Sequence, residues 1–193
     1  MGKLQICVLA LGMLLLLSDT SIAFPDGLPN NFQEYKSRYQ RYATTPEGAV
    51  KMYFDAVFCY INQSTRAEAI KMLRYSMHEK AGWESSHAYA TFVSRLKDPY
   101  YHYIFRSFAE GTSPQNDYAM STNRYHIMID SKRPQSDYLQ INLISSGADS
   151  PRITHAQKFD DGLWYMTNIH GTYSDVRQPA SYTNRNAHDA DYD

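Results

Sequence analysis

The spacing of apolar residues changes once along the chain, near residue 124, from a helical period to a strand period. Before that point apolar side chains recur every three or four residues, as at Val50, Tyr53, Phe54 and Val57. After it they alternate with polar residues or form β-branched and aromatic runs, over residues 124–130, 138–145, 152–159 and 163–169. The sequence therefore predicts an α+β fold in which N-terminal helices pack on a curved antiparallel sheet of about four to five strands.

Capping residues mark the starts of the predicted helices. Thr45-Pro46 combines a hydroxyl cap with a proline in the first turn, where no amide partner is needed. Thr65 and Glu68 have the spacing of a capping box and predict a second helix. Further helices are expected over residues 89–96 and 98–108.

The helix that begins at Pro46 carries one broad apolar face. Cys59 lies within this helix, so we expect a buried free thiol. Asp55 lies on the polar side of the same helix and is expected to be solvated.

The first 23 residues have the pattern of a signal peptide. An apolar run of about a dozen residues is followed by Ser21-Ile22-Ala23, which offers small residues to signal peptidase. The run is shorter than the about 20 residues that cross a bilayer, which disfavours a membrane anchor. Cys7 precedes the run instead of closing it, which disfavours a lipoprotein. We therefore expect cleavage near Ala23 and a secreted or periplasmic protein.

Four segments are expected in all. After the signal peptide of residues 1–23, an arm and helix occupy residues 24–44, where Phe32, Tyr35, Tyr39 and Tyr42 form a stripe that packs on the domain. A single α+β domain is predicted over residues 45–174. The polar residues 175–193 are expected to be a disordered tail.

The charge balance limits the expected partners. With 19 basic and 20 acidic residues, the chain has no excess charge that would attract nucleic acid or an anionic membrane. We expect a small ligand or a protein partner, which could be a second copy in a homodimer. No membrane span is expected after signal cleavage. No cofactor is indicated, and a lone Glu84-x-x-His87 pair does not make a metal site.

Four stretches carry a resemblance to a known family: TPEGAVKMYFDAV, FRSFAEGTSPQNDY, SSGADSPR and KFDDGLWYM. Over about residues 45–180 the chain resembles a family of exported bacterial proteins of unknown function. The family shares a Gly-Thr-x-Pro-x-Asn-x-Tyr segment and the SSGADSPR corner, but the resemblance implies no catalytic residues. The chain departs from the family after the last strand, where residues 170–175 replace a short apolar segment.

The order of elements also resembles the cone-shaped fold of nuclear transport factor 2 and the SnoaL-like cyclases. That resemblance implies a pocket between helices and sheet, and it implies no particular activity. Candidate ligand-binding residues for such a pocket are His102, which tyrosines flank, and Trp164 and Asn168, which share a strand face. Asp149 and Arg152 could form a polar clamp at its mouth. No catalytic residue is assigned.

Two functions remain open. The first is an exported domain that binds a small ligand or an envelope or extracellular protein without catalysis. The alternative is a small-molecule lyase or isomerase that uses His102, Asn168 and a tyrosine around the pocket. A titratable side chain at the pocket floor whose polar atoms lack protein partners would favour the enzyme.

The SSGADSPR stretch admits two interpretations as well. As a structural corner, it would use Gly147 for a positive φ, Pro151 to enter the next strand, and an Asp149–Arg152 pair. As a site, the same Asp149 and Arg152 would hold a carboxylate or phosphate.

Overall fold

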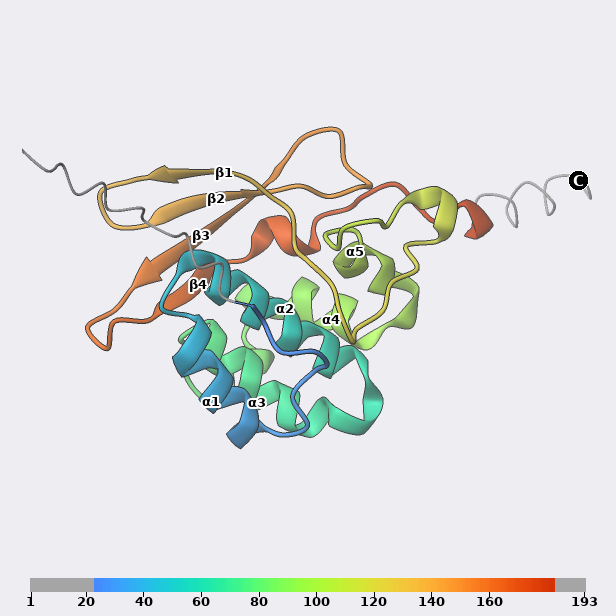
Figure 1. Ribbon diagram of the computed structural model, residues 1–193. Helices are drawn as coiled ribbons and strands as arrows, with labels where there is room; N and C mark the ends of the chain where they lie inside the picture. The colour runs from blue at the N-terminus through green and yellow to red at the C-terminus, as the bar shows by residue number, and fades with distance from the viewer. Residues whose placement is uncertain (1–22, 183–193) are drawn as a thin grey trace, which may run out of the picture.

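The computed structural model describes residues 23–182, in which helices lie against one side of an antiparallel sheet (Figure 1). The predicted α+β class is confirmed, and the sheet has four strands and is not closed. The predicted signal peptide up to Ile22, and residues 183–193 of the predicted tail, lie outside the described residues. Within residues 23–182, no helix combines the length and the hydrophobicity needed to cross a bilayer.

Five α-helices run through the described residues: α1 (Phe32–Tyr42), α2 (Pro46–Ile61), α3 (Arg66–Ser76), α4 (Ala90–Lys97) and α5 (His102–Arg106). Short 3₁₀ turns connect them or follow them, at Gln63–Thr65, Trp83–Ser85, His87–Tyr89, Pro99–Tyr101, Pro114–Asn116 and His170–Tyr173.

The predicted cap at the start of α2 is confirmed, and the predicted capping box at the start of α3 is wrong. The Thr45 hydroxyl accepts the Gly48 amide at 3.1 Å, as the cap requires. The capping box is wrong, because the Thr65 hydroxyl donates to the Cys59 carbonyl instead, at 2.6 Å. Glu68 accepts the amide of Phe32, at 3.0 Å, and so ties α3 to the start of α1.

Helix α2 is the centre of the fold and is buried on all sides from Gly48 to Tyr60. It contacts α1, α3, α4 and β4. The expected buried free thiol is confirmed at Cys59. The expected solvation of Asp55 is wrong, because this residue is only 2% exposed. The polar side of α2 faces the arm and the residues before β1 instead of solvent.

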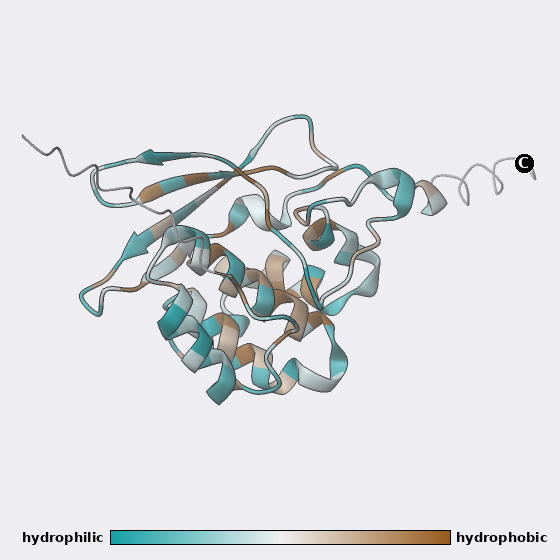
Figure 2. Cartoon of the chain, in the orientation of Figure 1, coloured by the Kyte–Doolittle hydropathy of each residue, from teal (hydrophilic) through white to brown (hydrophobic). Residues whose placement is uncertain are grey.

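The sheet is a meander in the order β1-β2-β3-β4, formed by β1 (Ile129–Pro134), β2 (Leu139–Leu143), β3 (Arg152–Lys158) and β4 (Trp164–Asn168). Strand β4 contacts α2, while β1 is the strand farthest from the helices (Figure 1). Hydrophobic residues gather on α2 and β2, whereas β1 is largely hydrophilic (Figure 2). The Asp160-Asp161-Gly162 turn joins β3 to β4 as a hairpin, with Gly162 at a φ of 81°.

The first strand begins later than its sequence pattern predicts. Residues 124–128 form only an isolated bridge, between Ile127 and Ala109, before the regular pairing of β1 starts. In the predicted apolar row of Tyr125, Ile127 and Ile129, the first residue packs on a helix. The centroid of the Tyr125 ring lies 5.0 Å from that of Phe58 in α2. Packing on α2 therefore replaces strand pairing over the first half of the predicted strand.

The SSGADSPR stretch forms a corner between β2 and β3. Its serines bond to the segment after α5, with Ser145 Oγ 2.7 Å from Ser107 Oγ and Ser146 Oγ 3.0 Å from Thr112 Oγ1. Gly147 does not have the positive φ that the sequence suggested. It needs space instead, because a Cβ atom at this position would lie 2.2 Å from the Tyr118 hydroxyl.

Residues 175–177, which composition assigned to the tail, lie against this corner. The Arg177 amide donates to the Gly147 carbonyl at 2.9 Å, and Val176 is buried. Asp175 pairs with Arg95 at 2.8 Å.

Candidate functional site

His102, the histidine expected in a pocket, is a buried structural residue. Its ring Nε2 lies 3.0 Å from the Leu96 carbonyl, so in this assignment the N–H donates to the end of α4. Burial lowers its pKa and so favours the neutral ring.

Trp164 and Asn168 do not share a pocket with His102. Trp164 is half-buried at the start of β4, where its amide donates to the Ala43 carbonyl at 2.7 Å. Asn168 Oδ1 accepts the amide of His170 at 3.1 Å and so caps the end of the strand.

Asp149 and Arg152 do not form the expected pair. Asp149 pairs with Arg177 at 3.0 Å, and its side chain is 90% exposed. Arg152 donates to the Asp175 carbonyl at 2.6 Å and so holds the segment after β4. Asp149 and Arg152 therefore both bond to the segment after β4, one to Arg177 and the other to Asp175.

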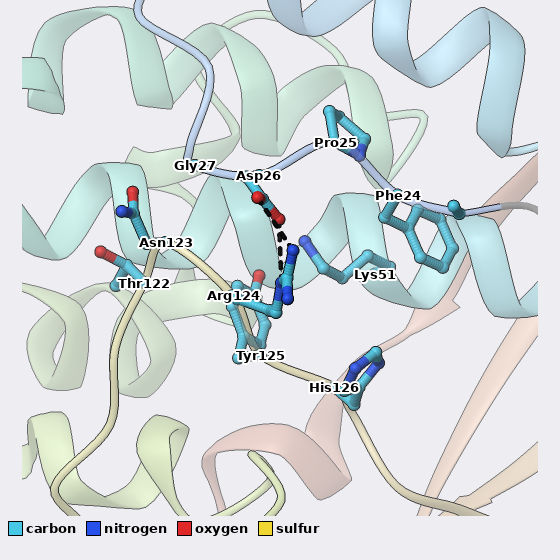
Figure 3. A pocket seen from close by; sticks show the side chains of 11 residues that line it. Phe24, Pro25, Asp26, Gly27, Lys51, Thr122, Asn123, Arg124, Tyr125 and His126 are labelled. Atoms are coloured by element: carbon cyan, nitrogen blue, oxygen red, sulfur yellow. Dashed lines mark hydrogen bonds and ion pairs between the residues drawn. The ribbon is translucent and has the colours of Figure 1, made fainter.

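A cleft with a different lining opens between the N-terminal arm and the residues before β1. Its walls are residues 23–27 on one side and residues 122–126 on the other, with Lys51 of α2 between them (Figure 3). The cavity volume is about 260 Å³. A neighbouring hollow of about 230 Å³ extends toward Val50, Ile127 and Ile129.

Lys51, Asp55 and Tyr125 form a buried cluster at the base of this cleft. Lys51 Nζ and the Tyr125 hydroxyl each donate to Asp55 Oδ1, both at 2.6 Å. Lys51 Nζ also lies 4.2 Å from the centroid of the Tyr125 ring, in cation–π geometry. Lys51 is 8% exposed and Asp55 is 2% exposed. The lysine is therefore the charged member of the cluster that reaches the cleft.

Burial governs the ionisation of this cluster. It raises the pKa of Asp55, while the Lys51 ammonium and the Tyr125 hydroxyl offset part of that rise. Burial also raises the pKa of Tyr125 well above its ordinary value, and the Asp55 charge adds to the rise. Tyr125 is therefore a hydrogen-bond donor at neutral pH.

The arm is fixed at Gly27. Its amide donates to the Asn123 carbonyl and its carbonyl accepts from Arg38 Nη1, both at 2.7 Å. Closer to the N-terminus, Asp26 pairs with Arg124 through two contacts of 3.1 Å. These bonds join the arm to the segment that carries Tyr125.

The sequence contains a signal for this cluster that periodicity alone does not use. Lys51 and Asp55 are one helical turn apart, with opposite charges, in a helix whose other residues after Glu47 are apolar or aromatic. Beyond the first turn these two are the charged residues of the helix, which is too few for a solvated face and is compatible with a buried ion pair. Nothing in the sequence pairs them with Tyr125, which lies 70 residues after Asp55.

The cluster offers the Lys51 ammonium as a cationic donor, since the Tyr125 hydroxyl already donates to Asp55. Within residues 23–182, His, Cys, Asp and Glu residues form no group of three that could hold a metal ion. Arg124 and His126 add exposed nitrogen groups to the wall of the cleft. The arrangement can therefore bind an acceptor oxygen.

The comparisons with known proteins give a family without an activity. A family described as a domain of unknown function, DUF6935, matches residues 27–180. No curated protein and no solved structure shows a significant match to the chain. The matched range includes every helix and strand described above, together with Lys51, Asp55 and Tyr125. The chain therefore belongs to the DUF6935 family, a domain of unknown function.

Proposed function

We propose that this chain is an exported domain that binds a small ligand, without catalysis, in the cleft over Lys51. The observation that carries the proposal is the buried Lys51–Asp55–Tyr125 cluster at the base of that cleft. Export is supported by the signal-peptide pattern of residues 1–23.

A buried ion pair adds little to the stability of a fold. This favours a role of the Lys51–Asp55 pair in ligand recognition. Removing two charges from water costs several kcal/mol per ion, and mutual attraction only partly offsets that cost. An apolar pair of similar volume would serve the core of α2 as well. The ammonium of Lys51 at a cleft instead provides a fixed donor for a ligand oxygen.

The bonding of the cluster favours binding over catalysis. A general base needs a free acceptor that faces the substrate. Asp55 Oδ1 already accepts from both Lys51 and Tyr125, and the residue is almost entirely buried. The lyase or isomerase alternative has less support, because His102 and Asn168 are engaged with the main chain in separate places.

The size of the cleft suits a ligand of about one ring. Ligand pockets for drug-sized molecules are typically about 300–1,000 Å³, and this cavity is about 260 Å³. Val50, Tyr125 and Ile127 supply apolar wall, while Lys51, Arg124 and His126 supply nitrogen groups. The ligand class that fits is a small molecule with an apolar body and an acceptor oxygen.

The test is a ligand screen on the full chain and on a variant without the charged pair. Lys51→Met combined with Asp55→Asn removes both charges and leaves neither partner alone. A set of small carboxylates, including benzoate, hexanoate and 4-phenylbutyrate, would be screened by NMR titration. We expect at least one to bind the unmodified chain and to lose binding in the double variant.

Lys71→Met is the matched control, because Lys71 pairs with Glu68 on the exposed side of α3. It should bind as the unmodified chain does. Carboxylates that bind the double variant equally well would refute the site. If the unmodified chain binds none of them but self-associates in sedimentation, a protein partner replaces the small ligand as the better proposal.

A further inference from the structure

We infer that Phe24 occupies the place of the ligand's ring, and that Asp26 occupies the place of its acid group. Residues 23–26 then act as a built-in competitor that swings away at Gly27 when the ligand binds. The inference rests on the proposed function and specifies its ligand class as a small aromatic carboxylate.

The ring of Phe24 divides one potential cavity into two. Phe24, Lys51, Tyr125 and His126 line both the cleft of about 260 Å³ and the neighbouring hollow of about 230 Å³. Of these, Phe24 is the one that belongs to the arm (Figure 3). Its departure would join the two spaces over Lys51.

Phe24 contacts its surroundings as a bound aromatic ligand would. Its ring centroid lies 5.2 Å from that of Tyr42 and 5.7 Å from Lys51 Nζ. The ammonium of Lys51 therefore has the Tyr125 ring near it, at 4.2 Å, and the Phe24 ring farther away. A ligand ring in place of Phe24 would keep this cation–π contact.

The acid of the arm is held by a group that a ligand carboxylate could take over. Arg124 donates from Nε to Asp26 Oδ1 and from Nη2 to Asp26 Oδ2. This is the two-point geometry that guanidinium groups use for carboxylates. The arm thus presents a ring and a carboxylate two residues apart to Lys51 and Arg124. When the arm leaves, both cationic groups become available together.

The arm is weakly held before Gly27 and firmly held from Gly27 onward. The Asp26–Arg124 pair is exposed, at 62% and 76% of the two side chains, and exposed pairs contribute little to stability. From Gly27 on, the chain is fixed by a main-chain bond to Asn123 and a bond from the Arg38 side chain, both of 2.7 Å, and by the buried Pro29. Gly27, with a φ of 76° and no Cβ to restrict rotation, lies where the arm changes from firmly to weakly held, so we place the hinge at its N-terminal side.

The family match agrees with a separable arm. It begins at residue 27, so Lys51, Tyr125 and Arg124 lie within the domain while Phe24 and Asp26 lie outside the matched range. The predicted cleavage after Ala23 would also leave Phe24 as the first residue of a free end.

The experiment measures binding of 4-phenylbutyrate to the full chain and its variants by NMR titration. Phe24→Ala removes the competing ring, and Asp26→Asn removes the competing charge without emptying any core site. The apparent affinity is the intrinsic affinity multiplied by the fraction of molecules whose arm is open. We therefore expect Phe24→Ala, which opens the arm, to bind 4-phenylbutyrate about tenfold more tightly than the unmodified chain. Asp26→Asn should give a smaller gain. Phe32→Ala is the matched control, since Phe32 is also half-buried but packs on Tyr75.

Two comparison probes test the ligand class. Butyrate lacks the ring and 4-phenylbutanol lacks the charge, so each should bind Phe24→Ala more weakly than 4-phenylbutyrate does. Equal affinity of the unmodified chain and Phe24→Ala would overturn the inference, because Phe24 would then not compete. Weaker binding by Phe24→Ala would overturn it too, since Phe24 would then be part of the wall.

These outcomes are separate from failure of the proposed function. Loss of binding in Lys51→Met with Asp55→Asn supports the cleft as the site whatever Phe24 does. If 4-phenylbutyrate binds neither the unmodified chain nor Phe24→Ala, the competitor inference fails, while another carboxylate that depends on Lys51 would still support the cleft.

Discussion

A Cβ atom on Gly147 would lie 2.2 Å from the hydroxyl oxygen of Tyr118 and 2.9 Å from Cβ of Val176. Tyr118 cannot easily move away. It is fully buried, its hydroxyl donates to the Arg177 carbonyl at 2.6 Å, and its own φ of 54° is in the left-handed region. The corner thus brings two segments together at a point where only a hydrogen atom fits.

Gly147→Ala should therefore destabilise the protein by about 1–3 kcal/mol, the usual cost of overpacking a tight site. The free energy of unfolding from urea titration measures this. In a double-mutant cycle, Tyr118→Phe removes the hydroxyl that the new methyl group meets, so part of the loss should be recovered. Strictly additive losses would contradict the steric explanation.

Lys51→Met alone should cost about 3–5 kcal/mol, because it leaves the Asp55 carboxylate buried without its cationic partner. Adding Asp55→Asn should restore much of this stability. Lys71→Met, which removes an exposed pair, should change the free energy of unfolding by no more than about 1 kcal/mol. Equal effects of the two lysine substitutions would show that Lys51 is not buried in solution.

Helix α2 shows where the sequence predicted the structure and where it did not. Its start at Pro46 and the burial of Cys59 follow from local rules, namely capping and apolar spacing. The burial of Lys51 and Asp55 does not follow, since an i,i+4 pair has the same sequence on a solvated helix and beneath an arm. What covers a helix depends on residues far away in the chain.

In the sheet too, local sequence patterns predicted some elements, and contacts with distant residues changed another. The β2, β3 and β4 ranges come close to prediction because strand alternation and the Asp160-Asp161-Gly162 turn specify them locally. The first strand was expected from Arg124 but begins at Ile129, because Tyr125 is drawn to Asp55 and Phe58 of α2. The contacts of Tyr125 with α2 therefore both delay the start of β1 and form the candidate site. The late start of the strand and the burial of Asp55 have this one cause.

His102 should make stability depend on pH below neutrality. Burial holds its pKa below the ordinary value of 6.5, so on acidification the unfolded chain takes up a proton before the folded protein does. The stability that the neutral ring contributes is present above pH 6.5 and is lost as the pH falls through the lowered pKa.

In urea titrations at several pH values, His102→Gln should lose less stability on acidification than the unmodified chain. The glutamine amide can still donate to the Leu96 carbonyl but does not titrate in this range. His87→Gln, at an exposed position, is the control and should leave the pH profile unchanged. An unaltered profile in His102→Gln would show that the ring is not buried.

Cys59 should react slowly in the native protein. Burial raises the pKa of its thiol to about 12, and the thiol donates to the Pro29 carbonyl at 3.5 Å. Little thiolate is therefore available to a thiol reagent at pH 8. Absorbance with a chromogenic disulfide should show slow release that becomes fast in concentrated guanidinium chloride, and Cys59→Ser identifies any signal from Cys7. Fast native labelling that Cys59→Ser abolishes would contradict the burial.

The two edges of the sheet face other molecules differently. On β4, the Trp164 amide is already taken by the Ala43 carbonyl. On β1, the ladder shifts register between Ile129 and Ser131, and the strand closes with exposed Lys132, Arg133 and Pro134. A proline without an N–H, two charges and a broken register are features that keep edge strands from pairing with other chains. The sheet can therefore stay open at this edge at high protein concentration without becoming a template for aggregation.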